Sequence, residues 1–171
     1  MRFALGSDER SQLTDSVEAD LRRRGHEVKL IGAPGGDAMS WPDVAQVVAE
    51  AVAGGGVDQG VLFCWTGTGV SIAANKVPGI RAALCTDAET ARGARAWNEA
   101  NVLCLSLRIT TETLAKEILN AWFDALPDHS EAENVYKVNA IDERYRSRSG
   151  AGDSGQGGES ENLSGRRRTE A

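Results

Sequence analysis

Residues 61–76 (VLFCWTGTGVSIAANK) constrain the fold most, because an apolar run there stops abruptly at a turn that contains two glycines. The apolar run is typical of a buried strand, and a helix is predicted to begin at about Val70. Glycines let the backbone approach a ligand closely, and the N–H groups at a helix start favour negative charge. The stretch therefore predicts a small-molecule site, with Cys64 at the carboxyl end of its strand as the first candidate for chemistry.

The rest of the chain repeats this order of strand and helix. Apolar runs predict strands at residues 3–6, 27–32, 61–64, 80–85 and 101–107. Between and after them, apolar residues recur at helical spacing, and the last helix of this series is predicted over residues 111–126. Nearly continuous apolar strands that alternate with helices predict an α/β fold in which a five-stranded parallel sheet is covered on both faces.

Capping residues and apolar stripes mark the individual helices. Pro42 suits the first turn of a helix. The apolar stripe predicted for that helix consists of Val44, Val47, Val48, Ala51 and Val52. Further along, Thr86 or Asp87 can cap a helix that runs through Trp97. These signals predict where the helices begin, and the stripe predicts which face packs on the sheet.

The pattern weakens after Pro127. Val135, Val138, Ile141 and Tyr145 can form the stripe of one more helix, which can dock on another subunit. From about residue 147 the chain consists of Gly, Ser, Glu and Arg with almost no apolar residue. We therefore expect one domain over residues 1–146 and a disordered polar tail over 147–171.

Composition excludes several classes of protein. The formal net charge of -6 argues against non-specific binding of nucleic acid or of an anionic membrane. No apolar stretch is long enough for a membrane span, and the N-terminus becomes polar too early for a secretory signal. Three cysteines without a CxxC pair suggest reduced thiols and predict a cytoplasmic protein.

Nucleotide and metal motifs do not fit the sequence. A third glycine of a dinucleotide-binding motif would fall at Ile72, and Lys76 lies too far from the glycines for a phosphate-binding loop of the Walker type. The histidines, His26 and His129, show no spacing typical of metal ligands. We therefore predict neither a cofactor nor a metal.

Five segments, in this order and spacing, resemble the type B ribose-5-phosphate isomerase family, which includes the galactose-6-phosphate isomerase subunits. They are GSD (6–8), CWTGTG (64–69), SIAANK (71–76), GIRAA (79–83) and WNEANVL (97–103). The resemblance runs from Met1 to about Arg146. It implies a Rossmann-like three-layer sandwich, and a homodimer or tetramer whose active sites are shared between subunits. It also implies cofactor-free aldose–ketose isomerisation through an enediolate, which needs a base and fixed donors for an oxyanion.

The same resemblance implies roles for individual residues. Cys64 matches the thiolate base, and a helix N-terminus favours the thiolate form. Thr66 matches a hydroxyl that assists proton movement, and Asp8 and Asn98 match residues that bind sugar hydroxyls. The expected oxyanion donors are the backbone N–H groups of Gly67, Thr68, Gly69, Val70 and Ser71. The alternative for Cys64 is a small core residue, as we expect of Cys85 and Cys104.

Departures from the family pattern affect the expected phosphate site. Glu9 stands where the family has His, Glu133 where it has Arg, and Lys137 at a second Arg position. With Arg108, which matches a further Arg, these positions contact the substrate phosphate in the family. A desolvated carboxylate repels a phosphate. Glu9 can instead favour a helix start, and Glu133 can lie on a solvated face.

Two tryptophans change the expected sugar site. Trp97 stands where the family has its ring-opening histidine, and an indole cannot exchange a proton at neutral pH. Trp65 replaces a small residue between Cys64 and Thr66. Both tryptophans can line one pocket, or they can pack at a dimer interface.

These features favour an isomerase for a sugar phosphate of the ribose-5-phosphate/ribulose-5-phosphate type. An isomerase for a non-phosphorylated, open-chain or modified sugar is one alternative. A sugar-binding protein without turnover is another.

Overall fold

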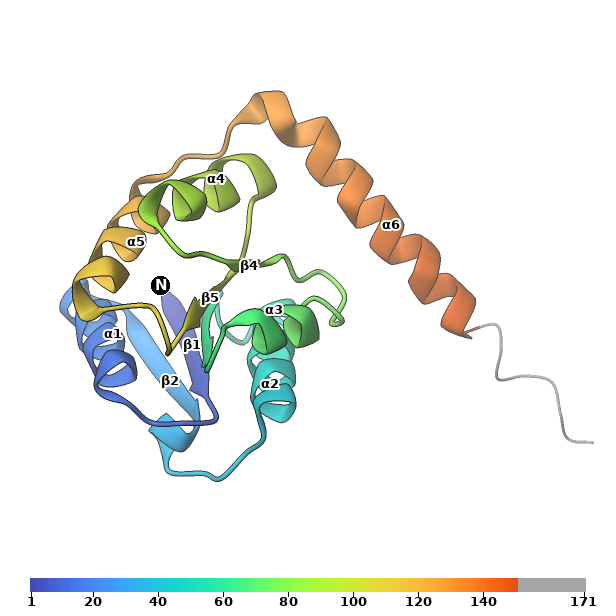
Figure 1. Ribbon diagram of the computed structural model, residues 1–171. Coiled ribbons are helices and arrows are strands. Elements are labelled where there is room, and N and C mark those ends of the chain that lie inside the picture. Colours follow the sequence, from blue (N-terminus) through green and yellow to red (C-terminus); the bar gives the residue numbers. More distant parts are fainter. Residues whose placement is uncertain (151–171) are drawn as a thin grey trace, which may run out of the picture.

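The structure is a computed structural model in which residues 1–150 are described, with side chains to Tyr145 (Figure 1). Its sheet has five parallel strands in the order β2-β1-β3-β5-β4. The strands are β1 (Arg2–Ser7), β2 (Glu27–Gly32), β3 (Gln59–Cys64), β4 (Ala82–Leu84) and β5 (Val102–Ser106). β3 lies in the middle and is buried along its whole length, as its apolar sequence predicts.

Helices cover both faces of the sheet and make it the middle layer of three. The helices are α1 (Gln12–Arg23), α2 (Trp41–Ala53), α3 (Thr68–Ala74), α4 (Ala88–Asn98), α5 (Glu112–Asp124) and α6 (Ala132–Gly150). Short 3-10 turns are η1 (Ala33–Gly35) and η2 (His129–Glu131). One core joins the sheet to α1, α4 and α5, and the other joins it to α2 and α3 (Figure 1). This confirms the predicted α/β fold and Rossmann-like three-layer sandwich.

Local boundaries differ from the predictions by a few residues. α3 begins at Thr68 rather than at Val70, because the positive φ of Gly67 ends the turn and lets the helix start at once. Strand β4 is shorter than the expected 80–85. Asp87 is the residue that caps α4, since its side chain accepts from the Thr90 N–H at 2.8 Å.

The predicted stripe of α2 is correct except at one position. Val44, Val48 and Val52 are buried, whereas Val47 is exposed. A residue directly before Val48 lies about 100° around the helix from it and so turns out of the buried face.

Helix α6 borders the body from Asn134 to Asp142, where it lines two hollows with the segment before β4, and it then extends beyond the body (Figure 1). Val135 is buried, but Val138, Ile141 and Tyr145 of the predicted stripe are exposed. The Gly79 N–H donates to Asp142 Oδ2 at 2.7 Å and so fastens the helix to the loop before β4. The helix continues to Gly150, four residues into the predicted tail, and the rest of that tail (151–171) lies outside the described residues. Among the described residues, no helix could cross a membrane.

Candidate active site

Cys64 is the last residue of β3, at the carboxyl edge of the sheet where neighbouring strands also end. It pairs with Ser106 of β5, and on the other side Phe63 pairs with Ser7, so that Asp8 follows at the same edge. The Cys64 carbonyl accepts from the N–H of Leu107 at 3.0 Å. Parallel pairing therefore brings Asp8 and Cys64 to one edge, although they are far apart in the sequence.

The backbone of Trp65, the residue after Cys64, is fixed by two hydrogen bonds to its carbonyl oxygen. The Trp65 carbonyl accepts from the Arg108 N–H at 3.0 Å and from Ser106 Oγ at 2.9 Å. The Trp65 side chain is 62% exposed. A fixed backbone thus presents a large indole at the open edge of the sheet.

Gly67 makes the sharp turn between β3 and α3. Its φ is +76°, and its N–H donates to the Cys64 carbonyl at 3.2 Å. A Cβ atom at this position would lie 2.5 Å from Leu84 Cδ1 and 3.0 Å from the carbonyl carbon of Leu105. Both the backbone conformation and the available space therefore require glycine here.

The first turn of α3 presents amide groups beside Cys64. Within residues 1–150, the N–H groups of Thr68, Gly69 and Val70 have no hydrogen-bond partner, as expected for the start of a helix. The expectation of five available donors is wrong at two positions. Gly67 donates to Cys64, and the Ser71 N–H donates to the Gly67 carbonyl at 3.3 Å.

These elements enclose a cavity of about 290 Å³ at the carboxyl edge of the sheet. Its lining residues are Asp8, Trp41, Cys64, Trp65, Thr66, Thr68 and Gly69. The hydroxyl oxygens of Thr66 and Thr68 lie 2.6 Å apart and share a hydrogen bond. The structure thus brings together Asp8, Cys64 and Thr66 with part of the predicted amide turn.

Trp41 is a lining residue that the sequence analysis missed. It is the first residue of α2, and a Cβ atom at Gly69 would lie 3.1 Å from Trp41 Cε3. The available signal was its position directly before Pro42, which marks a helix start. In a parallel α/β fold, such a helix start faces the ligand edge of the sheet.

The three cysteines have different surroundings. Burial raises the pKa of the Cys85 thiol to about 12, with a smaller contribution from the charge of Asp87. Burial likewise raises the pKa of the Cys104 thiol. Both are core residues, as predicted. Cys64 is also buried, at 7% exposure, in the core that joins the sheet to α2 and α3, but it lines the cavity as well. Cys64 is therefore the thiol that can meet a ligand.

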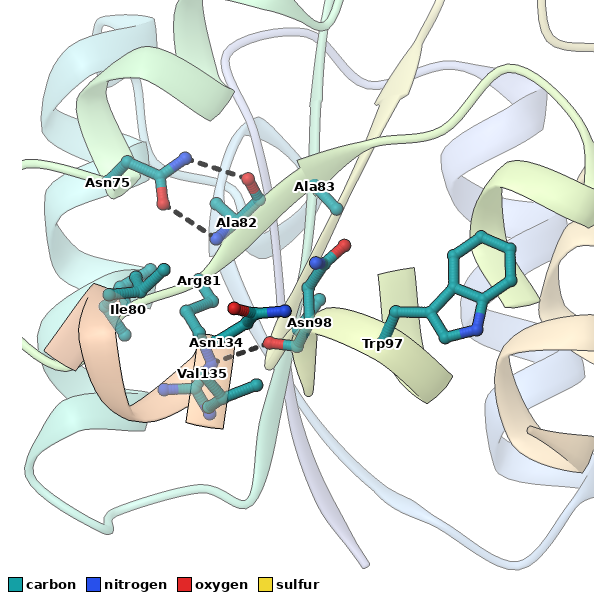
Figure 2. A pocket seen from close by; sticks show the side chains of 11 residues that line it. Asn75, Ile80, Arg81, Ala82, Ala83, Trp97, Asn98, Asn134 and Val135 are labelled. Carbon is teal, nitrogen blue, oxygen red and sulfur yellow. Dashed lines mark hydrogen bonds between the residues drawn. The ribbon is translucent and has the colours of Figure 1, made fainter. Parts of the chain in front are cut away.

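Trp97 and Asn98 line a different hollow, of about 310 Å³, between the last turn of α4, strand β4 and α6. Figure 2 shows Asn98 near Ala83 and across from Val135, while the indole of Trp97 is directed away from Asn98. That indole packs over its own helix, since a Cβ atom at Gly93 would lie 2.6 Å from Trp97 Cζ3. Within one chain, Trp65 and Trp97 therefore line different hollows.

The residues expected at the phosphate are spread over three places. Glu9 follows Asp8 but does not line the cavity, and Arg108 is exposed beside the Trp65 backbone. On α6, Lys137 Nζ lies 2.8 Å from Glu133 Oε1, and both side chains are mostly exposed. In this single chain, Glu133 and Lys137 therefore pair with each other.

A parallel three-layer fold with a cavity at the carboxyl edge of its sheet is typical of α/β proteins that bind small molecules at that edge. The sequence profile described as Ribose/Galactose Isomerase matches residues 3–141. The chain belongs to this family, and it is an aldose–ketose isomerase by class.

Individual relatives agree with this assignment. Ribose-5-phosphate isomerase B of Escherichia coli is 41% identical over 133 residues, which cover 77% of this chain and 89% of that protein. D-erythrulose-4-phosphate isomerase of Pectobacterium atrosepticum is 40% identical over 127 residues, or 73% of this chain and 84% of that protein. The solved structure of Clostridium thermocellum ribose-5-phosphate isomerase B has a TM-score of 0.79 and 40% identity, and the match covers 85% of this chain and 99% of that one.

Proposed function

We propose that the protein interconverts an aldose phosphate and a ketose phosphate through an enediolate, without a cofactor, and that Cys64 is the base. The supporting observation is that Cys64, Asp8 and unpaired amides of α3 border one cavity. The names of the relatives support a sugar phosphate as substrate, with ribose 5-phosphate as the reference case.

In the proposed reaction, the Cys64 thiolate removes a hydrogen from the carbon next to the carbonyl group. The electrons of that C–H bond form a carbon–carbon double bond, and the carbonyl oxygen becomes an oxyanion. In this proposal the oxygen accepts from the unpaired N–H groups of Thr68 and Gly69, the two residues of α3 that line the cavity. Cys64 then returns the proton to the former carbonyl carbon, while one hydroxyl proton passes between the two oxygens. No oxidant or reductant is needed.

Thr66 and Asp8 have supporting roles in this proposal. The Thr66 hydroxyl, paired with Thr68 at 2.6 Å, can pass the hydroxyl proton from one substrate oxygen to the other. Asp8 can accept hydrogen bonds from substrate hydroxyls, because its carboxylate is exposed on the cavity lining.

We also propose that two copies of the chain complete each site. The exposed stripe of Val138, Ile141 and Tyr145 on α6 supports this proposal, because it leaves apolar surface for another subunit. In such a dimer, the partner subunit's Asn98 and Lys137 would meet the substrate, and Arg108 would bind its phosphate. We expect the reaction in the cytoplasm, where thiols such as Cys64 stay reduced.

Activity assays of two matched cysteine variants test whether Cys64 is the catalytic base. We expect Cys64→Ala to lose at least about a hundredfold in kcat/KM on a panel of tetrose, pentose and hexose phosphates and the matching free sugars. Cys85→Ala removes a thiol from the core without touching the cavity, so it should keep the activity of the wild type. Equal activity of Cys64→Ala and wild type would rule out the thiol as base. Thermal stabilisation by a sugar phosphate without turnover would instead support a binding protein.

A further inference from the structure

We infer that Arg81 is a positioning residue of the active site, and that it holds Asn98 where this residue meets a substrate bound by a second copy of the chain. The inference rests on the proposed function, in which the partner subunit's Asn98 contacts the sugar. It follows from the hydrogen bonds around the turn that ends α4.

The side chain of Asn98 is not fixed by hydrogen bonds of its own. Asn98 is the last residue of α4, and it is exposed beside the hollow of about 310 Å³ that it lines. Within the part of the chain that the structure describes, its carboxamide group has no hydrogen-bond partner. This group is therefore free to bind sugar hydroxyls, and its place depends on the backbone that carries it.

The guanidinium group of Arg81 holds that backbone. Arg81 Nε donates to the Asn98 carbonyl at 2.9 Å, and Nη2 donates to the Glu99 carbonyl at 3.0 Å (Figure 2). Carbonyl groups at the end of a helix lack partners within the helix, and a cation is favoured beside them. One planar guanidinium thus satisfies two neighbouring carbonyls, which the single ammonium group of a lysine cannot do in the same geometry.

The conformation of Glu99 shows why this turn needs support. Its φ is +48°, and among residues 1–150 it is the only non-glycine residue with a positive φ. Such a conformation costs free energy at a residue with a side chain, and it persists where neighbouring contacts fix it. Here the Glu99 N–H donates to the Ala94 carbonyl, and the Glu99 carbonyl accepts from Arg81. Because Glu99 directly follows Asn98, these bonds set the direction in which the chain leaves the helix.

Arg81 is itself held at both ends. Its side chain is only 22% exposed. Its backbone N–H donates to Asn101 Oδ1 at 2.8 Å, and its Nη1 donates to Asn139 Oδ1 of α6 at 3.3 Å. Arg81 therefore joins the start of β4, the end of α4 and helix α6, and the position of its guanidinium group relative to the sheet is fixed.

Arg95 offers a matched control on the same helix as Asn98. Its Nη1 donates to the Ala100 carbonyl at 2.5 Å, and its Cζ lies 5.3 Å from the centroid of the Trp122 ring. Among the described residues, it donates no hydrogen bond to Asn98 or to α6. Loss of Arg95 should therefore weaken the packing of α4 without releasing the Asn98 carbonyl.

A double-mutant cycle tests the inference, with ribose 5-phosphate or the sugar of the earlier panel that the wild type converts fastest. We expect Arg81→Met and Asn98→Ala each to lower kcat/KM about ten- to a hundredfold. Most of this loss should be a higher KM, because Asn98 would bind sugar hydroxyls in the ground state and the transition state alike. The double variant should lose no more than about threefold beyond Asn98→Ala alone, since Arg81 acts through Asn98.

Two further variants separate positioning from stability. Arg95→Met should keep kcat/KM within about threefold of the wild type, although urea denaturation should show that it is less stable. Arg81→Lys should lie between Arg81→Met and the wild type, because an ammonium group keeps the charge but not the fork of donors. If Arg81→Met does not fold in buffer, Arg81→Lys takes its place in the cycle under the same criteria.

The inference and the proposed function fail in different ways. Wild-type activity of folded Arg81→Met would overturn the inference, and so would losses that multiply in the double variant or an equal loss in Arg95→Met. Unchanged activity of Asn98→Ala would also overturn it while leaving the isomerase reaction standing. A wild type that converts no sugar of the panel would overturn the proposed function and, with it, the inference.

Discussion

Trp41 packs directly against Gly69, so that a Cβ atom on Gly69 would lie 3.1 Å from Trp41 Cε3 and 3.2 Å from Cζ3. Trp41 begins α2, and Gly69 lies in the first turn of α3. The contact joins the start of one helix to the unpaired amides of the next, at the wall of the cavity that holds Cys64.

We predict that Gly69→Ala destabilises the wild type by about 1–3 kcal/mol, because the added methyl group meets the indole. In a Trp41→Ala background the same change should be neutral or stabilising by up to about 1 kcal/mol, since alanine favours a helix over glycine. Urea denaturation of the four proteins in this double-mutant cycle measures the coupling. The same change in the free energy of unfolding in both backgrounds would contradict the contact.

Gly67 should be far less tolerant of substitution than Gly79. Both have positive φ values, +76° and +81°, but a Cβ atom meets Leu84 and Leu105 at the first position and nothing within 4 Å at the second. Alanine at either site is strained by about 1–2 kcal/mol. We expect Gly67→Ala to cost at least about 1 kcal/mol more than Gly79→Ala in chemical denaturation. Equal losses in the free energy of unfolding for the two variants would show that the short contacts of a Cβ atom at Gly67 add no cost.

Thiol labelling should separate the three cysteines. Only a thiolate reacts, and burial holds the pKa of the Cys85 thiol at about 12, so this residue stays protonated and unreactive as pH rises from 7 to 10. We expect iodoacetamide to modify Cys64 alone in the folded protein and all three cysteines after denaturation, as measured by mass spectrometry. Modification of Cys85 in the native protein below pH 10 would contradict the structure.

Replacing Glu9 should improve the binding of phosphorylated sugars. Glu9 is exposed directly after Asp8 of the cavity lining, and its negative charge repels a phosphate. We expect Glu9→Gln to lower KM for a sugar phosphate by up to about tenfold, and Glu9→His to lower it further. The gain should shrink as salt is added, because exposed charges are screened. Unchanged KM in both variants would place Glu9 outside the reach of the phosphate.

Much of the site could be predicted from the chain because parallel strands end at one edge. Cys64 ends one apolar strand and Asp8 follows another, so the alternation of strands and helices was enough to place them at one edge. The glycine turn of 67–69 carried its own signal, since an apolar strand that breaks into glycines and then a helix is a common way to build a small-molecule site.

Other parts of the site depended on contacts that local patterns do not encode. Trp41 reaches the cavity because α2 packs beside α3. Trp97 folds over Gly93 of its own helix, so it does not join Trp65. The expected set of amide donors also changed, because the Gly67 and Ser71 N–H groups already have backbone partners.

The order of apolar runs, glycines and caps determined the α/β fold, its parallel sheet and the position of Cys64 at the ligand edge, since these features follow from periodicity and backbone preferences along the chain. Tertiary structure alone decided which side chains surround that thiol. Packing brings Trp41 onto Gly69 and leaves both histidines away from the cavity, and such contacts depend on how helices distant in sequence meet across the sheet.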